Sequence, residues 1–252
     1  MSTRLEPAKL LVSSNAEYTA RLAASPEEIR AAQQLRFQVF NVELKEGLSE
    51  SFATGLDADP FDAVCDHLLV EHLASKVIVG TYRLQTGASA AARLGYYSAQ
   101  EFDFQPYERV RHEIVELGRA CVHHQHRNLS VLGMLWKGIA DYCRQRGARY
   151  LIGCSSLTSQ DPRDGASMYA ELHRKYLVAP EFRTRPLEKF ECPLDQLAND
   201  PPKVPKLLRA YLSIGASICG PPALDREFKT IDFLTFVDLA SMPGEVKRRF
   251  LG

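Results

Sequence analysis

The chain has 252 residues and a formal net charge of zero, and 45% of its residues are hydrophobic, which is enough to bury a core. No apolar run approaches the roughly 18 residues of a membrane-spanning helix, and the N-terminal MSTRLEPAKL has no signal-like apolar stretch. We therefore expect one globular, intracellular unit over residues 1–252. The six cysteines lie far apart with no C-x-x-C pair, and we interpret them as buried free thiols.

Charge is distributed unevenly along the chain. Residues 1–66 contain 11 acids against 6 lysines or arginines, whereas residues 107–189 contain 14 lysines or arginines against 9 acids. This asymmetry predicts an acidic face for a cationic substrate and a basic face for an anionic partner. Solvated helix faces are the alternative explanation.

The first predicted elements are a short strand at residues 9–14 and a helix that begins at Ser25–Glu28, where a capping serine, a proline and two acids follow one another. Apolar residues at helical spacing carry this helix to about Leu44 or Gly47. Residues 47–62 have little periodicity, several acids and a proline, so we predict a mobile loop there.

Strands at residues 67–74 and 76–86 follow closely enough to form a hairpin, and a short alanine-rich helix is predicted at 88–94. A strand at 113–122, a long amphipathic helix that Gly147 ends, and the apolar strand YLIGCSS then form a β-loop-α-β unit. The loop amides and the helix N-terminus of such a unit form a ready anion site.

Beyond this unit we predict a helix at residues 165–176, a strand at 183–192, a linking loop at 193–205, a short helix, and a final strand at 230–239. Alternating strands and helices indicate an α/β or α+β fold, with a central mixed sheet flanked by helices. We expect a core over about residues 9–192 and a C-terminal extension, 193–252, that packs on it and completes the sheet.

Charged residues occur in an order that identifies a family. Arg36 and Phe40 form R-x-x-x-F, Asp59 and Asp62 form D-x-x-D, and Arg83 lies on its strand; E-x-x-R follows inside the strand VELGRACV. This order resembles the acyl-homoserine-lactone synthase branch of the GNAT acyltransferase superfamily. Longer segments, including DADPFDAVCDHLLV and LLRAYLSIGASICGPPALD, are similar to the ornithine N-acyltransferases of bacterial ornithine-lipid synthesis.

The resemblance covers roughly residues 30–240 and implies a GNAT-like acyltransferase that works without a metal or another cofactor. It further implies acyl carrier protein as the donor of a 3-hydroxyacyl chain, the α-amine of L-ornithine as the acceptor, and lyso-ornithine lipid as the product. We expect no nucleic-acid partner. Because the product enters a bilayer, we expect a cytoplasmic protein that contacts the inner membrane face through its C-terminal EVKRRFLG.

Acyl transfer from a thioester to an amine needs a base, donors for the developing oxyanion and orientation of both substrates. A purely structural strand would carry neither Glu116 nor Arg119, and we interpret Glu116 as the base and Arg119 as its catalytic neighbour. A structural ion pair between the two is the alternative. Tyr169 is a candidate general acid for the leaving thiolate. A covalent mechanism through Cys121 or Cys154 is less favoured, because direct transfer needs no enzyme intermediate.

For the acceptor we expect Asp57, Asp59 and Asp62 to compensate the two amines of ornithine, although a solvated acidic loop would look the same in sequence. Arg36 and Arg83 are candidates for binding the acceptor carboxylate, since a guanidinium holds a carboxylate bidentately. Either arginine could instead fix the acidic loop through an ion pair. The resemblance adds Phe40 to this acceptor site.

The segment HHQHRNLS lies where GNAT enzymes hold pantetheine and its phosphate, but it lacks the glycines of the usual pattern. This departure favours a carrier-protein donor over acetyl-CoA, with basic residues such as Arg109, Lys137 and Arg144 contacting the acidic carrier. Zinc binding by the three histidines is disfavoured, because their spacing points them in different directions. The candidate acyl and pantetheine residues are Cys121, Val122, Arg127, Asn128, Ser130, Ser155 and Ser156.

Two alternatives remain open. The same chemistry on another acceptor, such as glycine or a homoserine-lactone precursor derived from S-adenosylmethionine, would preserve these motifs. A non-catalytic module that binds acyl carrier protein would preserve the fold.

Overall fold

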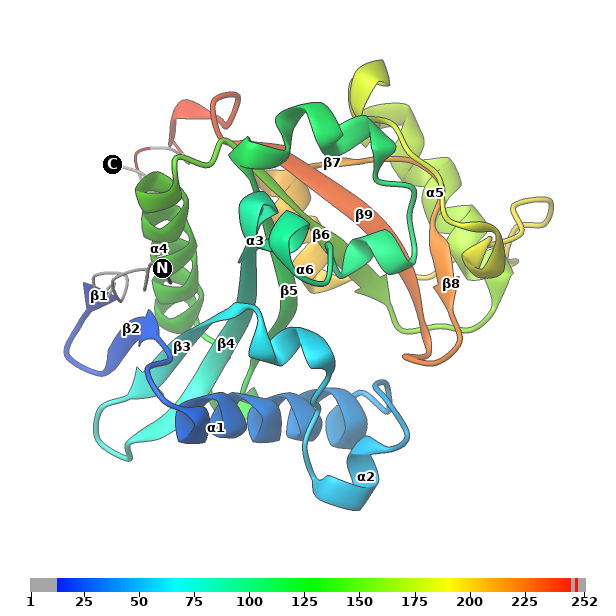
Figure 1. The fold of residues 1–252 in the computed structure, drawn as a ribbon. Coiled ribbons are helices and arrows are strands. Elements are labelled where there is room, and N and C mark those ends of the chain that lie inside the picture. The colour runs from blue at the N-terminus through cyan, green and yellow to red at the C-terminus, as the bar shows by residue number, and fades with distance from the viewer. Residues whose placement is uncertain (1–12, 246–247, 249–252) are drawn as a thin grey trace.

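The computed structural model describes residues 13–245 and 248, and it contains a nine-stranded mixed sheet flanked by helices (Figure 1). The order along the sheet is β1-β2-β3-β4-β5-β6-β9-β7, and β8 pairs with β9. The central pair β5 and β6 is parallel, and the other pairs are antiparallel. The strands are β1 (Ser13–Ser14), β2 (Tyr18–Leu22), β3 (Asp66–His72), β4 (Val77–Thr86), β5 (Ile114–Val122), β6 (Tyr150–Leu157), β7 (Ser217–Ile218), β8 (Ala223–Asp225) and β9 (Thr230–Asp238).

Helices begin and end where capping chemistry predicts. Ser25 caps the first helix through Glu28 N, Asn128 caps the long helix through Val131 N, and Gly147 ends that helix in a left-handed conformation with φ of 64°. The helices are α1 (Pro26–Phe37), α2 (Ser51–Thr54), α3 (Gly87–Ala92), α4 (Leu129–Arg146), α5 (Pro162–Tyr176) and α6 (Lys206–Ser213). None of the helices in the described ranges combines the length and the apolar character that a bilayer crossing requires.

Most predicted elements are confirmed. α1 passes into a six-residue π-helix, Gln38–Glu43, and together they span the predicted first helix. The strand predicted at 183–192 is wrong: this segment holds a short 3-10 helix at Glu188–Phe190 and isolated bridges. β2 was not predicted, because its five residues give too short a pattern. Most of the predicted strand at 9–14, and most of the C-terminal EVKRRFLG, lie outside the described residues.

The two faces of the sheet differ in chemistry. α4 covers an apolar face, where Leu68, Tyr82 and Leu117 join its core cluster. α1 contacts β3, β4 and β5, and its Arg36 lies with Arg83 of β4 in a polar group, so α1 covers the opposite face. The charged residues singled out in the sequence gather on this second face.

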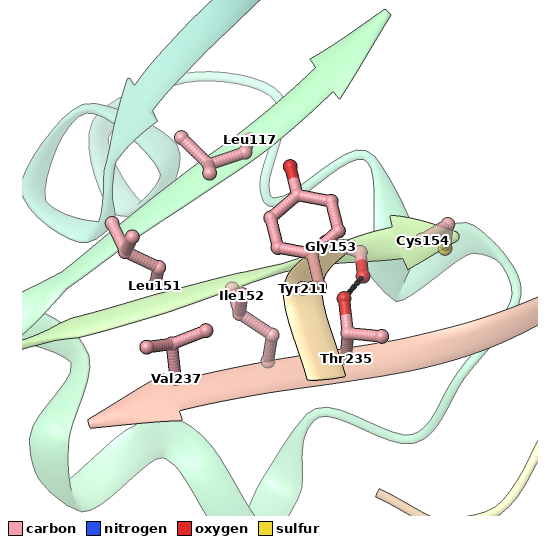
Figure 2. A pocket seen from close by; sticks show the side chains of 8 residues that line it. All are labelled: Leu117, Leu151, Ile152, Gly153, Cys154, Tyr211, Thr235 and Val237. Carbon is pink, nitrogen blue, oxygen red and sulfur yellow. Dashed lines mark hydrogen bonds between the residues drawn. The ribbon is translucent and has the colours of Figure 1, made fainter. Parts of the chain in front are cut away.

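Strands β5 and β6 pair only over Ile114–Glu116 and Tyr150–Ile152 and then separate. On the side of β6 away from β5, β9 pairs with β6 along its whole length, so the C-terminal segment adds a strand to the sheet. A small pocket lies at the separation, with Leu117 of β5, Gly153 of β6 and Tyr211 of α6 around it (Figure 2). A Cβ at Gly153 would lie 2.1 Å from the Leu117 carbonyl oxygen, so glycine is required there.

Candidate active site

A β-bulge brings Glu116 and Arg119 to one face of the sheet. In a regular strand, residues three apart point to opposite faces. Here the β4–β5 register shifts between Thr81 and Arg83, and Arg119 has a φ of 48°. The extra residue reverses the alternation, so both side chains reach the polar face. A positive φ in a non-glycine residue is strained, and such strain gathers at functional sites.

Glu116 is fixed by two backbone amides. Tyr97 N donates to Oε2 and Ser98 N donates to Oε1, both at 2.8 Å. The side chain is buried, and burial raises its pKa, although the Ser98 and Tyr97 hydrogen bonds oppose the rise. A carboxylate with a raised pKa and a fixed orientation is suited to accept a proton from an amine. The alternative of a structural Glu116–Arg119 ion pair is not what the structure contains, because Arg119 pairs with aspartates.

Arg36 of α1 hydrogen-bonds to two aspartates in the segment between α1 and β3. Its Nε donates to Asp57 Oδ2 at 2.9 Å, and its Nη2 donates to Asp62 Oδ2 at 2.7 Å and to the Asp57 carbonyl. Arg36, Asp57 and Asp62 are 1%, 0% and 5% exposed. The nearby guanidinium groups hold the pKa of Asp62 well below its usual range, against the opposing effect of burial. The acidic end of this segment is therefore buried and ion-paired to α1.

Arg83 and Arg119 complete the same network. Arg83 Nη1 donates to Asp59 Oδ1 at 2.6 Å and to Asp62 Oδ1 at 3.1 Å. Arg119 Nη2 donates to Asp59 Oδ2 at 3.2 Å, and its Nε lies 3.4 Å from Asp57 Oδ2. Three arginines thus face three aspartates, and their charges cancel.

The ion pairs of this network bear on two sequence predictions, the loop at residues 47–62 and the acceptor-binding role of Arg36 and Arg83. The loop predicted at residues 47–62 needs correction in two places: Ser51–Thr54 form α2, and Asp57 is fully buried, with its amide donating to the Gln33 carbonyl. The alternative, in which Arg36 and Arg83 fix the loop through ion pairs, describes the observed contacts. Their role in binding the acceptor stays a prediction.

Aromatic rings line the network. Arg83 and Arg119 lie over the Tyr97 ring, with the guanidinium carbons 5.1 and 4.9 Å from its centroid. Arg119 also lies 4.3 Å from the centroid of Phe228, which packs edge-on against Phe40. Cation–π contacts of this kind orient guanidinium groups. Phe40 therefore contacts the site through Phe228.

A second acidic group, which sequence reasoning missed, adjoins this network. Carboxylate oxygens of Glu101, Asp225 and Asp232 all lie within 4.8 Å of one another, and the three residues are 3%, 7% and 4% exposed. We call these three residues the acidic triad. More than a hundred residues separate the first member from the other two along the chain, so no local motif signals them. In the ranges that the structure describes, they are a group of carboxylates close enough to hold a cation.

Burial controls the ionisation of the triad. Desolvation raises the pKa of Asp232 to about 6, although hydroxyls of Ser156 and Thr230 donate to its two oxygens. Desolvation also raises the pKa of Glu101 well above its usual range, and the neighbouring Asp232 and Asp225 raise it further. Carboxyl groups with pKa values raised by burial in this way are candidates for a functional site.

Replacing Asp232 by asparagine is expected to stabilise the protein at neutral and alkaline pH. A carboxyl whose pKa rises on folding costs stability above the folded pKa, about 6, and costs none below its ordinary value of 3.8. We expect Asp232→Asn to raise Tm at pH 8 by about 5 °C, an effect of roughly 2 kcal/mol. The gain should vanish near pH 4. Thermal melts across this pH range measure it, and a Tm lowered equally at both pH values would contradict it.

The predicted donor-site residues have intramolecular partners. Asn128 caps α4, Ser130 Oγ accepts from Asn15 Nδ2 at 2.7 Å, and Arg127 pairs bidentately with Glu43, with Nη2 2.7 Å from Oε2. Arg127 Nε also donates to the Val122 carbonyl at 3.0 Å. These contacts order the segment before α4, and phosphate binding there stays a prediction.

The remaining predicted residues divide between the site and other regions. Ser156 joins the acidic triad, whereas the Ser155 hydroxyl lies 3.3 Å from that of Thr235. Cys121 is buried with Phe40, and burial raises the pKa of its thiol, so it is a poor nucleophile. Tyr169 packs against another core cluster from α5, and its ring contacts His173 at 5.2 Å. The structure does not bring Tyr169 together with the acidic site.

Comparisons with known proteins agree with this geometry. A family model described as "Acetyltransferase (GNAT) domain" matches residues 35–137. A crystal structure of the AHL synthase LasI superposes with a TM-score of 0.53 at 13% identity, covering 92% of this chain and 94% of that one. FeeM, an N-acyl amino acid synthase from uncultured soil microbes, gives 0.51 at 14% identity, covering 89% and 92%. These similarities confirm the predicted GNAT-like fold.

Curated relatives are similar along most of the chain. An L-ornithine N(alpha)-acyltransferase of Brucella abortus is 35% identical over 84% of this chain and 81% of its own length. A protein of the same name from Rhodobacter capsulatus is 32% identical over 92% of this chain and 94% of its own length. The chain is therefore an acyltransferase and belongs to the L-ornithine N(alpha)-acyltransferase family.

Proposed function

We propose that this protein transfers a 3-hydroxyacyl chain from acyl carrier protein to the α-amine of L-ornithine and releases lyso-ornithine lipid. The observation that carries the proposal is Glu116: a buried carboxylate, held by two amides, on the strand that borders the β5–β6 opening. The names of the curated relatives support ornithine as the acceptor.

The proposed reaction forms one amide bond and breaks one thioester bond. The α-amine attacks the thioester carbonyl, Glu116 accepts the proton that the nitrogen loses, and the thiolate leaves and is protonated. Each Glu116 oxygen accepts one backbone amide, which leaves a further acceptor site on it for this proton. The separation of β5 and β6 beyond Glu116 and Ile152 leaves their facing backbone groups to bind an extended donor.

An acidic carrier protein needs a basic surface on the enzyme, and the structure reduces the number of candidate residues for it. Arg111, Arg144, Arg146 and Arg149 pair with acids of the protein itself, so they provide less positive charge than the sequence indicates. Lys137 is exposed on α4 and remains a candidate contact for the acidic carrier. We propose a cytoplasmic location with contact to the inner membrane face, because the product is amphipathic.

Mass spectrometry of lipids tests the proposal in a bacterial host that makes no aminolipids. Expression of the protein should yield a new ornithine carrying an N-linked 3-hydroxyacyl chain, and added ornithine should increase its amount. The same host with Glu116→Gln provides the control. An N-acyl product on glycine or another amine would reject ornithine as the acceptor. Soluble protein without any acylated amine would indicate a carrier-binding module instead.

A further inference from the structure

We propose that the acidic triad, Glu101, Asp225 and Asp232, binds the side-chain ammonium of the amino-acid acceptor and so selects a cationic acceptor. This inference rests on the proposed function and assigns the recognition of the second amine to residues outside the motifs R-x-x-x-F, D-x-x-D and E-x-x-R. It replaces the expectation that Asp57, Asp59 and Asp62 perform this role.

The first argument is charge. Arg36, Arg83 and Arg119 already neutralise the three aspartates of the loop. Within the described residues, no member of the acidic triad forms an ion pair. Arg119 acts on the triad through space, but its hydrogen bond and close ion pairs go to Asp59 and Asp57. The triad carboxyls, unlike the loop aspartates, therefore have no ion-pair partner among the described residues.

The second argument is a buried carboxyl group whose side-chain donor is weak. Glu101 is 3% exposed, and the donor that the structure gives its side chain is the Cys154 thiol, 3.9 Å from Oε2. A thiol is a weak donor, and leaving a buried carboxylate without a strong one is costly. Glu101 points toward Asp225 and Asp232, because their oxygens lie within 4.8 Å of its own. An ammonium placed among these three carboxyl groups would donate to Glu101 more strongly than the thiol does.

The third argument is position. The Ser98 amide donates to Glu116, and one turn further along the same 3-10 segment the Glu101 amide donates to the Ser98 carbonyl at 3.2 Å. A short piece of backbone thus connects the proposed base to the triad. An acceptor whose α-amine lies at Glu116 has its side chain within reach of Glu101, which matches a molecule with two amines.

The ligand chemistry favours an ammonium over a divalent metal ion. An ammonium has three N–H donors, one for each carboxylate of the triad. The Ser156 and Thr230 hydroxyls each donate to one oxygen of Asp232, which leaves one further acceptor position on each, and the Glu227 and Phe228 amides both donate to Asp225 Oδ1, which leaves Oδ2. These positions suffice for the donors of an ammonium, whereas Mg²⁺ demands octahedral and Ca²⁺ six- to eightfold coordination.

The test compares L-ornithine with L-norvaline, which has the same carbon skeleton without the second amine. For the wild-type protein we expect kcat/KM to favour ornithine by about 100-fold or more, since a site built for a polar group rejects an analogue that lacks it. Glu101→Gln and Asp232→Asn should each reduce this preference at least about tenfold, by raising KM for ornithine while kcat with norvaline changes little. Glu181→Gln, an exposed acid, is the matched control and should change neither value.

The results of this test show whether the triad proposal fails, the proposed function fails, or both hold. If ornithine is acylated and both variants keep the wild-type preference, or if the wild type uses norvaline equally well, the triad is not the ammonium site. This second comparison needs no folded variant. Loss of activity in EDTA that Mg²⁺ or Ca²⁺ restores would assign the triad to a metal and overturn the inference. If the wild type acylates other amines and no ornithine, the proposed function itself fails.

Discussion

Glu116→Gln is expected to lower kcat by about 10²- to 10⁴-fold, the usual contribution of a positioned general base. Glutamine has the same shape, but it cannot accept the amine proton, and its NH₂ group would face one of the two amides that hold Glu116. KM for the acyl donor should change little, because the β5–β6 opening is preserved. Steady-state kinetics with both substrates measures the two effects separately.

The pH dependence of the wild-type protein provides an internal control for this prediction. Burial raises the pKa of Glu116, and the base acts only when deprotonated, so kcat/KM should fall as the pH falls through that raised pKa. Glu116→Gln should lose this acidic limb. A variant that keeps the wild-type rate would show that Glu116 is not the base and would favour a non-catalytic carrier-binding module.

Arg36→Met is expected to lower the free energy of unfolding by about 3–5 kcal/mol, the typical effect of removing one partner from a buried ion pair. The change leaves Asp57, which is fully buried, and Asp62, which is 5% exposed, without their shared guanidinium donor. Chemical denaturation at pH 7 measures the loss. Arg30→Met is the matched control, because Arg30 is exposed on the same helix, and it should change stability by less than about 0.5 kcal/mol.

Acid should reduce the difference between Arg36→Met and the wild type. A carboxyl whose folded pKa is depressed, such as Asp62, stabilises the folded state above its unfolded pKa, and this contribution is lost as the pH falls toward the folded pKa. The stability gap should therefore narrow below about pH 4. A loss no larger than that of Arg30→Met at pH 7 would mean that the network contributes no net stability.

Local chemistry explains what the sequence predicts well. Ser25 begins α1 and Gly147 ends α4 as predicted, because each satisfies orphan backbone groups by itself, whatever the rest of the fold does. The charged face of β5 was recognised from Glu116 and Arg119 alone. A spacing of three residues in a regular strand predicts that the two side chains point to opposite faces. They point to the same face because of a bulge in the pairing of β5 with β4, which the sequence does not reveal.

Tertiary contacts explain what the sequence could not predict. Residues 47–62 have the composition of a solvated loop, and much of the segment is exposed; Asp57 and Asp62 are buried because Arg36, Arg83 and Arg119, from three other elements, pair with the loop aspartates. The acidic triad forms because β9 inserts beside β6 and places Asp232 near Glu101. Neither the arginine–aspartate network nor the acidic triad produces a repeating pattern in the sequence. Only the assembled sheet brings these residues together.

The most direct test of this account is a reaction of the purified protein with a 3-hydroxyacyl chain on acyl carrier protein and L-ornithine, analysed by fragmentation mass spectrometry. We expect one product, with the acyl chain on the α-nitrogen and the side-chain amine free, and release of the carrier thiol in equal amount. Acylation of the side-chain amine, or hydrolysis of the donor without any N-acyl product, would contradict the account.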